Sequence, residues 1–285
     1  MSNILISKVV KKDKEKIVKF LIENHIYQTT KQNWNNLFEH NWNKIDNFGF
    51  QIKNEEEIVG YFGLIFSDQK LKGKTIVNLH SWVVKKEYRS HSIKLLREIM
   101  KLKDIILVSH STINQILKIY YKLQWKVLDE NYYYIFGTLF SNKNIDLEMI
   151  TNSNCNLLSN YNKKIYDSHN SYKSVFLKFN IDDNEVLIIG KIKVIKKYIP
   201  IFEIIFVSDL YLFNKNINSL IKDIKNKTKT FFCRIDSRFL ESNKNLICKK
   251  LKMKGFKKIF YAHKENINDL SILNNLYSEI FLLNT

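Results

Sequence analysis

The chain of 285 residues contains one proline, seven glycines and three cysteines. The cysteines, Cys155, Cys233 and Cys248, lie far apart and form no Cys-x-x-Cys pair. Neither a disulfide framework nor a zinc site is therefore indicated. Alanine is also scarce, whereas lysine, asparagine and isoleucine are abundant, as expected when A+T-rich codons drift into surface positions. We expect a protein that works without a bound metal.

Long apolar runs are missing as well. The most apolar stretch, residues 198–213, is interrupted by Glu203 and Asp209, whereas a membrane-spanning helix needs about 20 apolar residues in succession. The start of the chain lacks the apolar core of a cleavable signal peptide. Together with unpaired cysteines, these features predict a cytoplasmic protein with no membrane span.

Acidic residues are outnumbered by basic ones, 28 to 46, which gives a formal net charge of +18. A surplus of this kind suits an anionic partner such as nucleic acid, a membrane surface or coenzyme A (CoA). The lysines are scattered along the whole chain, however, so a dedicated nucleic-acid surface is not favoured. Length and a hydrophobic content of 45% predict two folded domains, and the oligomeric state stays open.

Motifs for several common chemistries are absent, namely a Walker-type phosphate loop, a Ser-His-Asp order and a metal-ligand cluster. The most informative segment of the chain is residues 84–94, with the sequence Val-Lys-Lys-Glu-Tyr-Arg-Ser-His-Ser-Ile-Lys. This segment ends an apolar run and opens a helical pattern, which predicts a strand, a tight turn and a helix start. Free N–H groups and the helix dipole at such a start suit a pyrophosphate. An ordinary turn with a serine cap is the alternative, and we favour a nucleotide-type cofactor.

The first half of the chain predicts two helices, an antiparallel meander, a helix, a strand, a helix and final strands. The expected helices are residues 13–24, a short helix around Trp34, residues 90–103 and residues 112–123. The expected strands are residues 49–53, 58–67, 75–84, 104–109 and 126–140. The segment 141–162 is rich in asparagine and serine, which predicts a linker.

The segment 84–94 and this order of elements resemble the GNAT (GCN5-related N-acetyltransferase) superfamily. In that family an Arg/Gln-x-x-Gly-x-Gly/Ala loop holds the pyrophosphate of acyl-CoA. Arg89 matches the first position, Ser90 and Ser92 stand where small residues are wanted, and Lys94 replaces the last small residue. Serine is the mildest replacement for glycine, since its hydroxyl can cap a helix or donate to a phosphate.

The resemblance extends to the helix that follows, which in the family ends Tyr-x-x-x-Gly-Phe. Tyr120 matches, and Gln124 and Trp125 replace Gly-Phe. The resemblance implies an α/β (α+β) fold with a largely antiparallel sheet, and acetyl-CoA or another acyl-CoA as co-substrate. The cofactor contacts that it implies are Trp82, Val84, Arg89, Ser90, His91, Ser92, Ile93, Lys94 and Asn114.

Acyl transfer needs a base for the nucleophile and an acid for the leaving thiolate. Strand alternation over residues 75–84 predicts Asn78, His80, Trp82 and Val84 on one face. His80 is therefore the candidate base beside the expected thioester, although a histidine satisfied within the sheet would look the same. The resemblance makes Tyr120 the candidate acid, with core packing as the alternative. Residues 109–111, Ser-His-Ser, are lower-ranked polar candidates.

The second half predicts a diverged copy of the first. Strands are expected at 172–179, 185–196, 199–207, 229–235, 257–262 and 277–283, and helices at 216–227 and 242–254. No arginine followed by small residues precedes the helix at 216–227, and Leu251 stands at the position of the motif tyrosine. We expect residues 1–145 to form the acyl-CoA-binding catalytic domain and residues 146–285 a degenerate domain that is structural or shapes the acceptor site.

The expected activity is transfer of an acetyl or other acyl group to an amine or hydroxyl of a small or sugar-like acceptor, for example in surface-polysaccharide biosynthesis. The run Tyr132–Tyr133–Tyr134 is either strand surface or part of a sugar-binding pocket. Two alternatives remain: a non-catalytic GNAT-like binding module, and an aminoacyl-tRNA-dependent transferase with paired GNAT-like domains. Salt-sensitive binding of tRNA would distinguish the latter.

Overall fold

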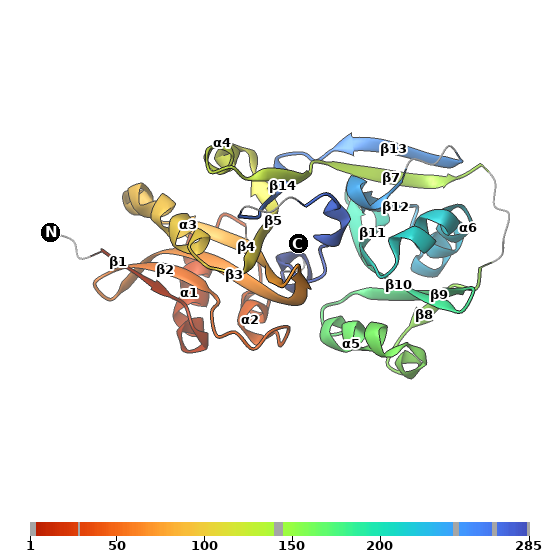
Figure 1. Ribbon diagram of the computed structural model, residues 1–285, viewed down its shortest axis with the longest axis horizontal. Coiled ribbons are helices and arrows are strands. Elements are labelled where there is room, and N and C mark those ends of the chain that lie inside the picture. Colours follow the sequence, from red (N-terminus) through yellow and green to blue (C-terminus); the bar gives the residue numbers. More distant parts are fainter. Residues whose placement is uncertain (1–3, 28, 140–144, 242–244, 264–266, 284–285) are drawn as a thin grey trace. The chain divides into compact units, whose positions relative to one another are not determined.

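The computed structural model describes residues 4–27, 29–139, 145–241, 245–263 and 267–283. The chain forms two compact units. The first comprises Met1–Leu128, Lys258–Asn268 and Tyr277–Thr285, and the second comprises Asp129–Lys257 and Asp269–Leu276. Each unit contains a seven-stranded, largely antiparallel sheet flanked by helices (Figure 1). The fold class expected from the sequence, a duplicated α+β sheet domain, is confirmed.

The sheet of the first unit has the strand order β1-β2-β3-β4-β5-β14-β6. Its strands are β1 (Ile4–Lys8), β2 (Gly49–Asn54), β3 (Glu57–Leu71), β4 (Lys74–Val84), β5 (Ile105–Ile113), β14 (Phe256–Tyr261) and β6 (Lys126–Asp129). Strands β1 to β4 pair antiparallel, and β4 pairs parallel with β5. This parallel pair is the place where the chain must cross over the sheet, and it does so through a helix.

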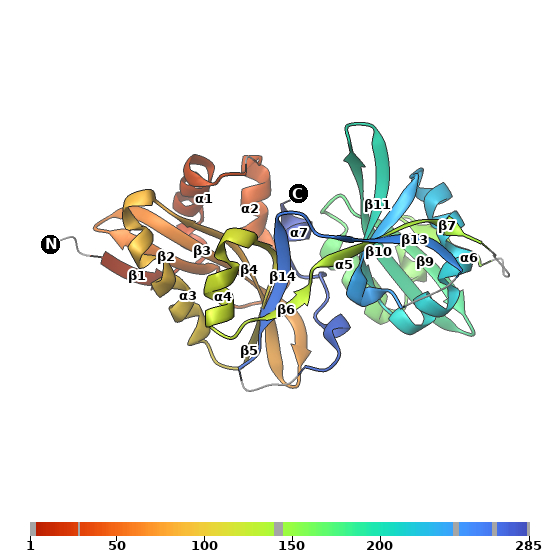
Figure 2. The same cartoon turned by 90° about the horizontal axis from the view of Figure 1, so that it is seen from above.

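Helices cover both faces of this sheet. Helices α1 (Lys14–Asn24) and α2 (Lys31–Glu39) lie on one face, and α3 (Ser92–Met100) and α4 (Leu117–Lys122) on the other (Figure 2). Each helix buries an apolar stripe at helical spacing, as Leu95, Leu96 and Ile99 of α3 illustrate. A short helix, α7 (Glu279–Leu282), completes the unit.

The sheet of the second unit repeats this topology with the order β8-β9-β10-β11-β12-β7-β13. Its strands are β8 (Glu148–Ile150), β9 (Val175–Ile181), β10 (Asn184–Ile195), β11 (Ile199–Val207), β12 (Phe232–Asp236), β7 (Asn131–Thr138) and β13 (Leu246–Lys252). Helix α6 (Leu210–Thr228) packs Phe213, Ile217 and Leu220 into the core of this unit. Strand β8 and the start of helix α5 (Asn160–His169) lie within the segment 141–162, which was expected to be a linker.

The two halves of the sequence exchange one strand. β14, from the end of the chain, stands between β5 and β6 in the first sheet, and β7, from the first half, stands between β12 and β13 in the second. Figure 2 shows β14 beside β6. A contiguous boundary at residues 145/146 therefore does not describe the units, because residues 129–138 belong to the second unit and residues 258–263 to the first.

Three further expectations are corrected. Residues 246–252 form strand β13 instead of a helix at 242–254, because they pair antiparallel with β7 along its open side; residues 242–244 lie outside the described part. Residues 277–283 contain the helix α7 instead of a strand. Strand β1 was not anticipated, since its five residues carry little alternation of their own and are ordered by pairing with β2.

Candidate functional site

The parallel strands β4 and β5 separate partway along their length. They pair from Thr75–Ile105 to Asn78–Val108, and beyond these residues β4 continues to Val84 and β5 to Ile113. We call the diverging segments, residues 79–84 and 109–113, the fork. The candidate residues of the first unit lie along its two arms, at the helix that follows β4, and in the segment 114–120 that follows β5.

The segment after β4 forms a basic helix start. Residues Lys86–His91 make a turn of 3-10 helix, and α3 follows directly at Ser92 without a side-chain cap on its first turn. Arg89, Ser90 and Lys94 are exposed there. No residue between 85 and 94 has a positive φ angle, so serine fits where the resemblance wanted glycine. Two exposed cations and a helix N-terminus thus face the solvent together.

A bulge in β4 changes which side chains share a face. Tyr61 pairs with Val83, but Gly63 pairs with His80, so β4 holds an extra residue between these pairs. Ser81 adopts a left-handed conformation there, with φ of 51°. Alternation is reversed at this point, and Trp82 packs against the same core as Leu79. The expectation that Asn78, His80, Trp82 and Val84 lie on one face is therefore wrong.

The α3–α4 face of the fork is aromatic. Trp82 stacks on Phe62, with 4.7 Å between ring centroids, and meets Tyr120 edge-on at 5.8 Å. Tyr120 is buried, and burial raises its pKa above the ordinary value. The phenol therefore carries its proton at neutral pH, and burial makes it a weaker acid than a free tyrosine. Val84 and Ile93 pack against the same core, so the structure brings these four predicted residues together.

The end of α4 shows how the sequence departs from the family motif. Gln124 has φ of 63°, a left-handed conformation that favours glycine. Trp125 follows it, is buried, and contacts Tyr120 edge-on at a centroid distance of 4.7 Å. Gln124 and Trp125 thus take the backbone and packing positions of the Gly-Phe pair.

His80 lies on the opposite face from Tyr120. Its ring fills the space above Gly63, where a Cβ would collide with the imidazole, and its Nδ1 lies 3.0 Å from Ser81 Oγ. Burial, reinforced by the charges of His40 and His25, lowers the pKa of His80 to about 3. The imidazole is therefore neutral at pH 7, and it is a much weaker base than the sequence suggested.

A carboxylate that sequence reasoning missed lies at the fork. Glu279 accepts a hydrogen bond from Asn78 Nδ2 at 2.5 Å and another from Ser111 Oγ at 2.7 Å. It is buried, and burial raises its pKa despite these two bonds and the charge of Lys258. The one signal in the sequence was a lone acid within the apolar segment 277–283.

The remaining candidates fall into three groups: buried residues of β5, an exposed residue after β5, and residues of the second unit. Ser109 is buried and accepts a hydrogen bond from Thr112 at 2.7 Å, and His110 is buried. Asn114 is exposed, directly after β5. Residues 132–134 belong to β7 in the second unit, where Arg234 lies 4.7 Å from the ring centre of Tyr132. They therefore give no support to an aromatic pocket in the first unit.

The second unit has a comparable parallel pair without the basic helix start. β11 and β12 pair from Ile201–Phe232 to Ile204–Ile235. Helix α6 is capped by Asp209, whose carboxylate accepts a hydrogen bond from the N–H of Leu212 at 2.9 Å. A carboxylate at this helix start occupies the anion position and repels a phosphate.

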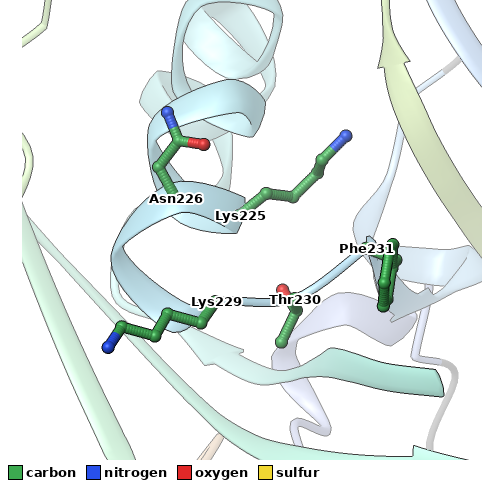
Figure 3. Close-up of a pocket in the computed structure, with 5 residues that line it drawn as sticks. All are labelled: Lys225, Asn226, Lys229, Thr230 and Phe231. Atoms are coloured by element: carbon green, nitrogen blue, oxygen red, sulfur yellow. The ribbon is translucent and has the colours of Figure 1, made fainter. Parts of the chain in front are cut away.

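A pocket of about 280 Å³ lies at the other end of α6, lined by Lys225, Asn226, Lys229, Thr230 and Phe231 (Figure 3). The side chains of Lys225 and Lys229 point away from each other in this view. A helix C-terminus carries a negative partial charge that nearby lysines complement, so this hollow is a solvated helix end with little to recognise a ligand.

The described ranges contain neither a metal-binding cluster nor a membrane-spanning helix. Within residues 4–27, 29–139, 145–241, 245–263 and 267–283, no group of three or more His, Cys, Asp or Glu side chains is placed to hold a metal ion. No helix of these ranges is long and apolar enough to cross a membrane.

Comparison with known proteins shows the fold. No family model and no curated protein matches the sequence. A GCN5-related N-acetyltransferase from Anabaena variabilis superposes with a TM-score of 0.61 at 12% identity, covering 90% of this chain and 72% of that chain. A probable N-acyltransferase from Enterococcus faecalis gives 0.59 at 12% identity, covering 96% and 74%.

A putative acetyltransferase from Pyrococcus horikoshii gives a TM-score of 0.54 at 11% identity, and this match covers 96% of this chain and 94% of that one. These likenesses span both units, and each unit contains the same seven-strand topology. The chain therefore has the GNAT fold, present twice.

Proposed function

We propose that the first unit binds acyl-CoA and transfers its acyl group, most simply acetyl, to an amine or hydroxyl. The observation that carries this proposal is the basic start of α3 beside the fork. Arg89 and Lys94, at the positive end of the α3 dipole, supply charge and hydrogen bonds for a pyrophosphate. The second unit offers Asp209 at the equivalent helix start.

The cofactor would extend from this helix start into the fork. Trp82 and Val84 on β4 and Ile93 on α3 would contact it, Ser90, His91 and Ser92 would line the turn, and Asn114 would lie beside it at the end of β5. Tyr120, held protonated by burial, is the acid in this proposal and gives its proton to the departing thiolate. The rings of Trp82 and Trp125 contact the ring of Tyr120 and would keep water away from its hydroxyl.

The proposal assigns the acceptor to the fork as well. His80 stays a candidate base, but a pKa of about 3 makes it a poor one at neutral pH. We keep a small or sugar-like acceptor, as in polysaccharide biosynthesis, as the proposed class. The second unit is proposed to be structural or to shape acceptor use, because its helix start lacks cations.

The proposal is tested by thermal unfolding with increasing acetyl-CoA. A ligand at 100 times its dissociation constant stabilises the native state by about 2.7 kcal/mol, which corresponds to several degrees for chains of this size. We expect this shift in the parent and its loss in Arg89→Ala. Arg97→Ala is the matched control, since Arg97 is exposed on the same helix and its removal changes the charge equally.

No shift in the parent at millimolar acetyl-CoA would refute the enzyme proposal and leave a GNAT-like binding module. An equal loss in Arg97→Ala would show that the net charge of +18, and not the helix start, attracts the nucleotide. A shift caused by tRNA in place of CoA, weakening with salt, would favour the aminoacyl-tRNA alternative.

A further inference from the structure

The C-terminal segment of the first unit carries a glutamate to the point where β4 and β5 separate. Asn78, which donates to Glu279 Oε2, is the last β4 residue paired with β5. Ser111, which donates to Glu279 Oε1, lies on β5 beyond its last residue paired with β4. One carboxylate is thus bound to both arms of the fork.

The segment that carries Glu279 is itself held in place. From α2, Asn33 donates to the carbonyl of Leu283 at 2.9 Å and Asn36 to that of Leu282 at 3.1 Å. Phe281 and Leu282 are fully buried. The position of the carboxylate is therefore set by packing on one side and hydrogen bonds on the other, as a site residue requires.

Burial differs sharply along this chain of hydrogen bonds. Glu279 is 4% exposed, whereas Ser111 is exposed to solvent. The Ser111 hydroxyl, 2.7 Å from the carboxylate, therefore connects a buried base to the accessible side of the fork. A hydroxyl can accept one proton while donating another, so it can pass a proton inward.

His80, the alternative base, is less suited to accept a proton than Glu279. Burial disfavours the charged form of any group, which weakens a histidine as a base and strengthens a carboxylate. The pKa of His80 falls to about 3, while that of Glu279 rises. A general base works best when its pKa lies near the operating pH, and the buried carboxylate is the group that burial moves in that direction.

We propose that Ser111 and Glu279 form the proton relay of acyl transfer, with Ser111 contacting the acceptor and Glu279 receiving the proton. This inference rests on the proposed function. The acceptor's lone pair forms a bond to the thioester carbonyl carbon while its N–H or O–H proton passes to Ser111 Oγ. The Ser111 proton passes to Glu279 Oε1, the C–S bond breaks, and the thiolate takes a proton from Tyr120.

The raised pKa of Glu279 also predicts how the folding stability depends on pH. The charged group whose field acts on it is Lys258 of β14, which favours the carboxylate form, and Asn78 and Ser111 act in the same direction. Burial outweighs these three contributions and that of a backbone hydrogen bond, and it raises the pKa. The folded state then binds more protons than the unfolded state, so stability is full at low pH and falls as the pH rises through the folded pKa.

The test uses the intact chain with acetyl-CoA as donor, glucosamine as probe acceptor, and release of the CoA thiol as readout. Glu279→Gln removes the proton-accepting carboxylate and keeps the shape of the side chain, with one oxygen left to accept a hydrogen bond. Ser111→Ala removes the relay hydroxyl. Each should lower kcat by roughly 10²–10⁴-fold, the range of a general acid–base contribution, while acetyl-CoA binding stays unchanged. The double variant should lose little more than either single variant, since one proton path is removed.

Glu39→Gln is the control, because Glu39 pairs with Lys14 on the surface and should leave the rate unchanged. Turnover by Glu279→Gln at the parental rate would overturn the relay and leave the proposed function intact. A parent that does not bind acetyl-CoA would instead overturn the proposed function, and the relay with it.

Stability against pH decides the case in which the parent binds acetyl-CoA but does not use glucosamine. A base with a raised pKa loses folding stability as the pH rises from acid to neutral, so the parent should lose stability relative to Glu279→Gln over this range. If the parent instead gains stability relative to Glu279→Gln as the pH rises, the carboxylate is a structural anion held by Asn78, Ser111 and Lys258, and the inference is wrong.

Discussion

Two residues in left-handed backbone conformations set the side-chain arrangement at the fork. Ser81, with φ of 51°, inserts the bulge that sends Trp82 and His80 to opposite faces of the sheet. Gln124, with φ of 63°, turns the chain so that Trp125 packs on Tyr120. A non-glycine residue in this region is strained by roughly 1 kcal/mol. The chain thus accepts local strain in order to place its aromatic side chains.

The strain at Gln124 is measurable. Gln124→Gly should raise the free energy of unfolding by about 0.5–1 kcal/mol, because glycine adopts this conformation freely and part of the gain is offset by its entropy in the unfolded chain. Gln124→Ala is the control, since it shortens the side chain but keeps the Cβ. Chemical denaturation of the three proteins gives the values. Equal stabilities of the glycine and alanine variants would show that the backbone is not strained there.

At the scale of elements, the main feature is the exchange of β7 and β14. Each of these strands belongs to the sheet that is formed mostly by the other half of the sequence. Ile259 of β14 is fully buried in the core of the first unit, with Leu79 and Leu107. Ile135 of β7 is fully buried in the core of the second unit, with Phe202 and Ile235. Each half of the sequence therefore completes the core of the other.

The exchange predicts reciprocal effects of two core substitutions. Ile259→Ala should cost about 2–5 kcal/mol and speed amide exchange in β4 and β5, which are far away in the sequence. Ile135→Ala should do the same in β10 and β11. Hydrogen-exchange mass spectrometry distinguishes the two patterns. If each substitution loosens only the strands of its own sequence half, the strands are not exchanged.

The helices and strands of the first half were largely predictable from local signals, such as the apolar run at 58–67, the strand pattern at 75–84 and the helical spacing at 13–24. Strand exchange was not, since nothing in β14 itself shows whether β12 or β5 will be its neighbour. The helix expected at 242–254 failed for the same reason: lysine-rich residues with helix-like spacing are held as β13 by pairing with β7.

The residues of the candidate site also divide into those that a local motif indicates and those that depend on contacts between distant parts of the chain. Arg89 and Tyr120 were found from a local motif, and the structure places them at a helix start and at the fork. The grouping of His80 with Trp82 was wrong, because a bulge cannot be read from alternation. Glu279 was missed because its partners Asn78 and Ser111 are more than 160 residues away in the chain.

At the scale of the whole molecule, the chain contains one fold twice but equips the two copies differently. The first helix start carries Arg89 and Lys94, and the second carries Asp209. Phosphates bind helix starts that offer positive charge, so we expect the first copy, and not the second, to bind CoA. We therefore expect one nucleotide site in a protein that contains the fold twice.

Calorimetric titration of the intact chain with acetyl-CoA tests this central claim most directly, because it counts sites. We expect one molecule bound per chain, with the binding heat lost in Arg89→Ala and retained in Asp209→Ala. Two equivalent sites, no binding in the parent, or a single site that survives Arg89→Ala would each contradict the account.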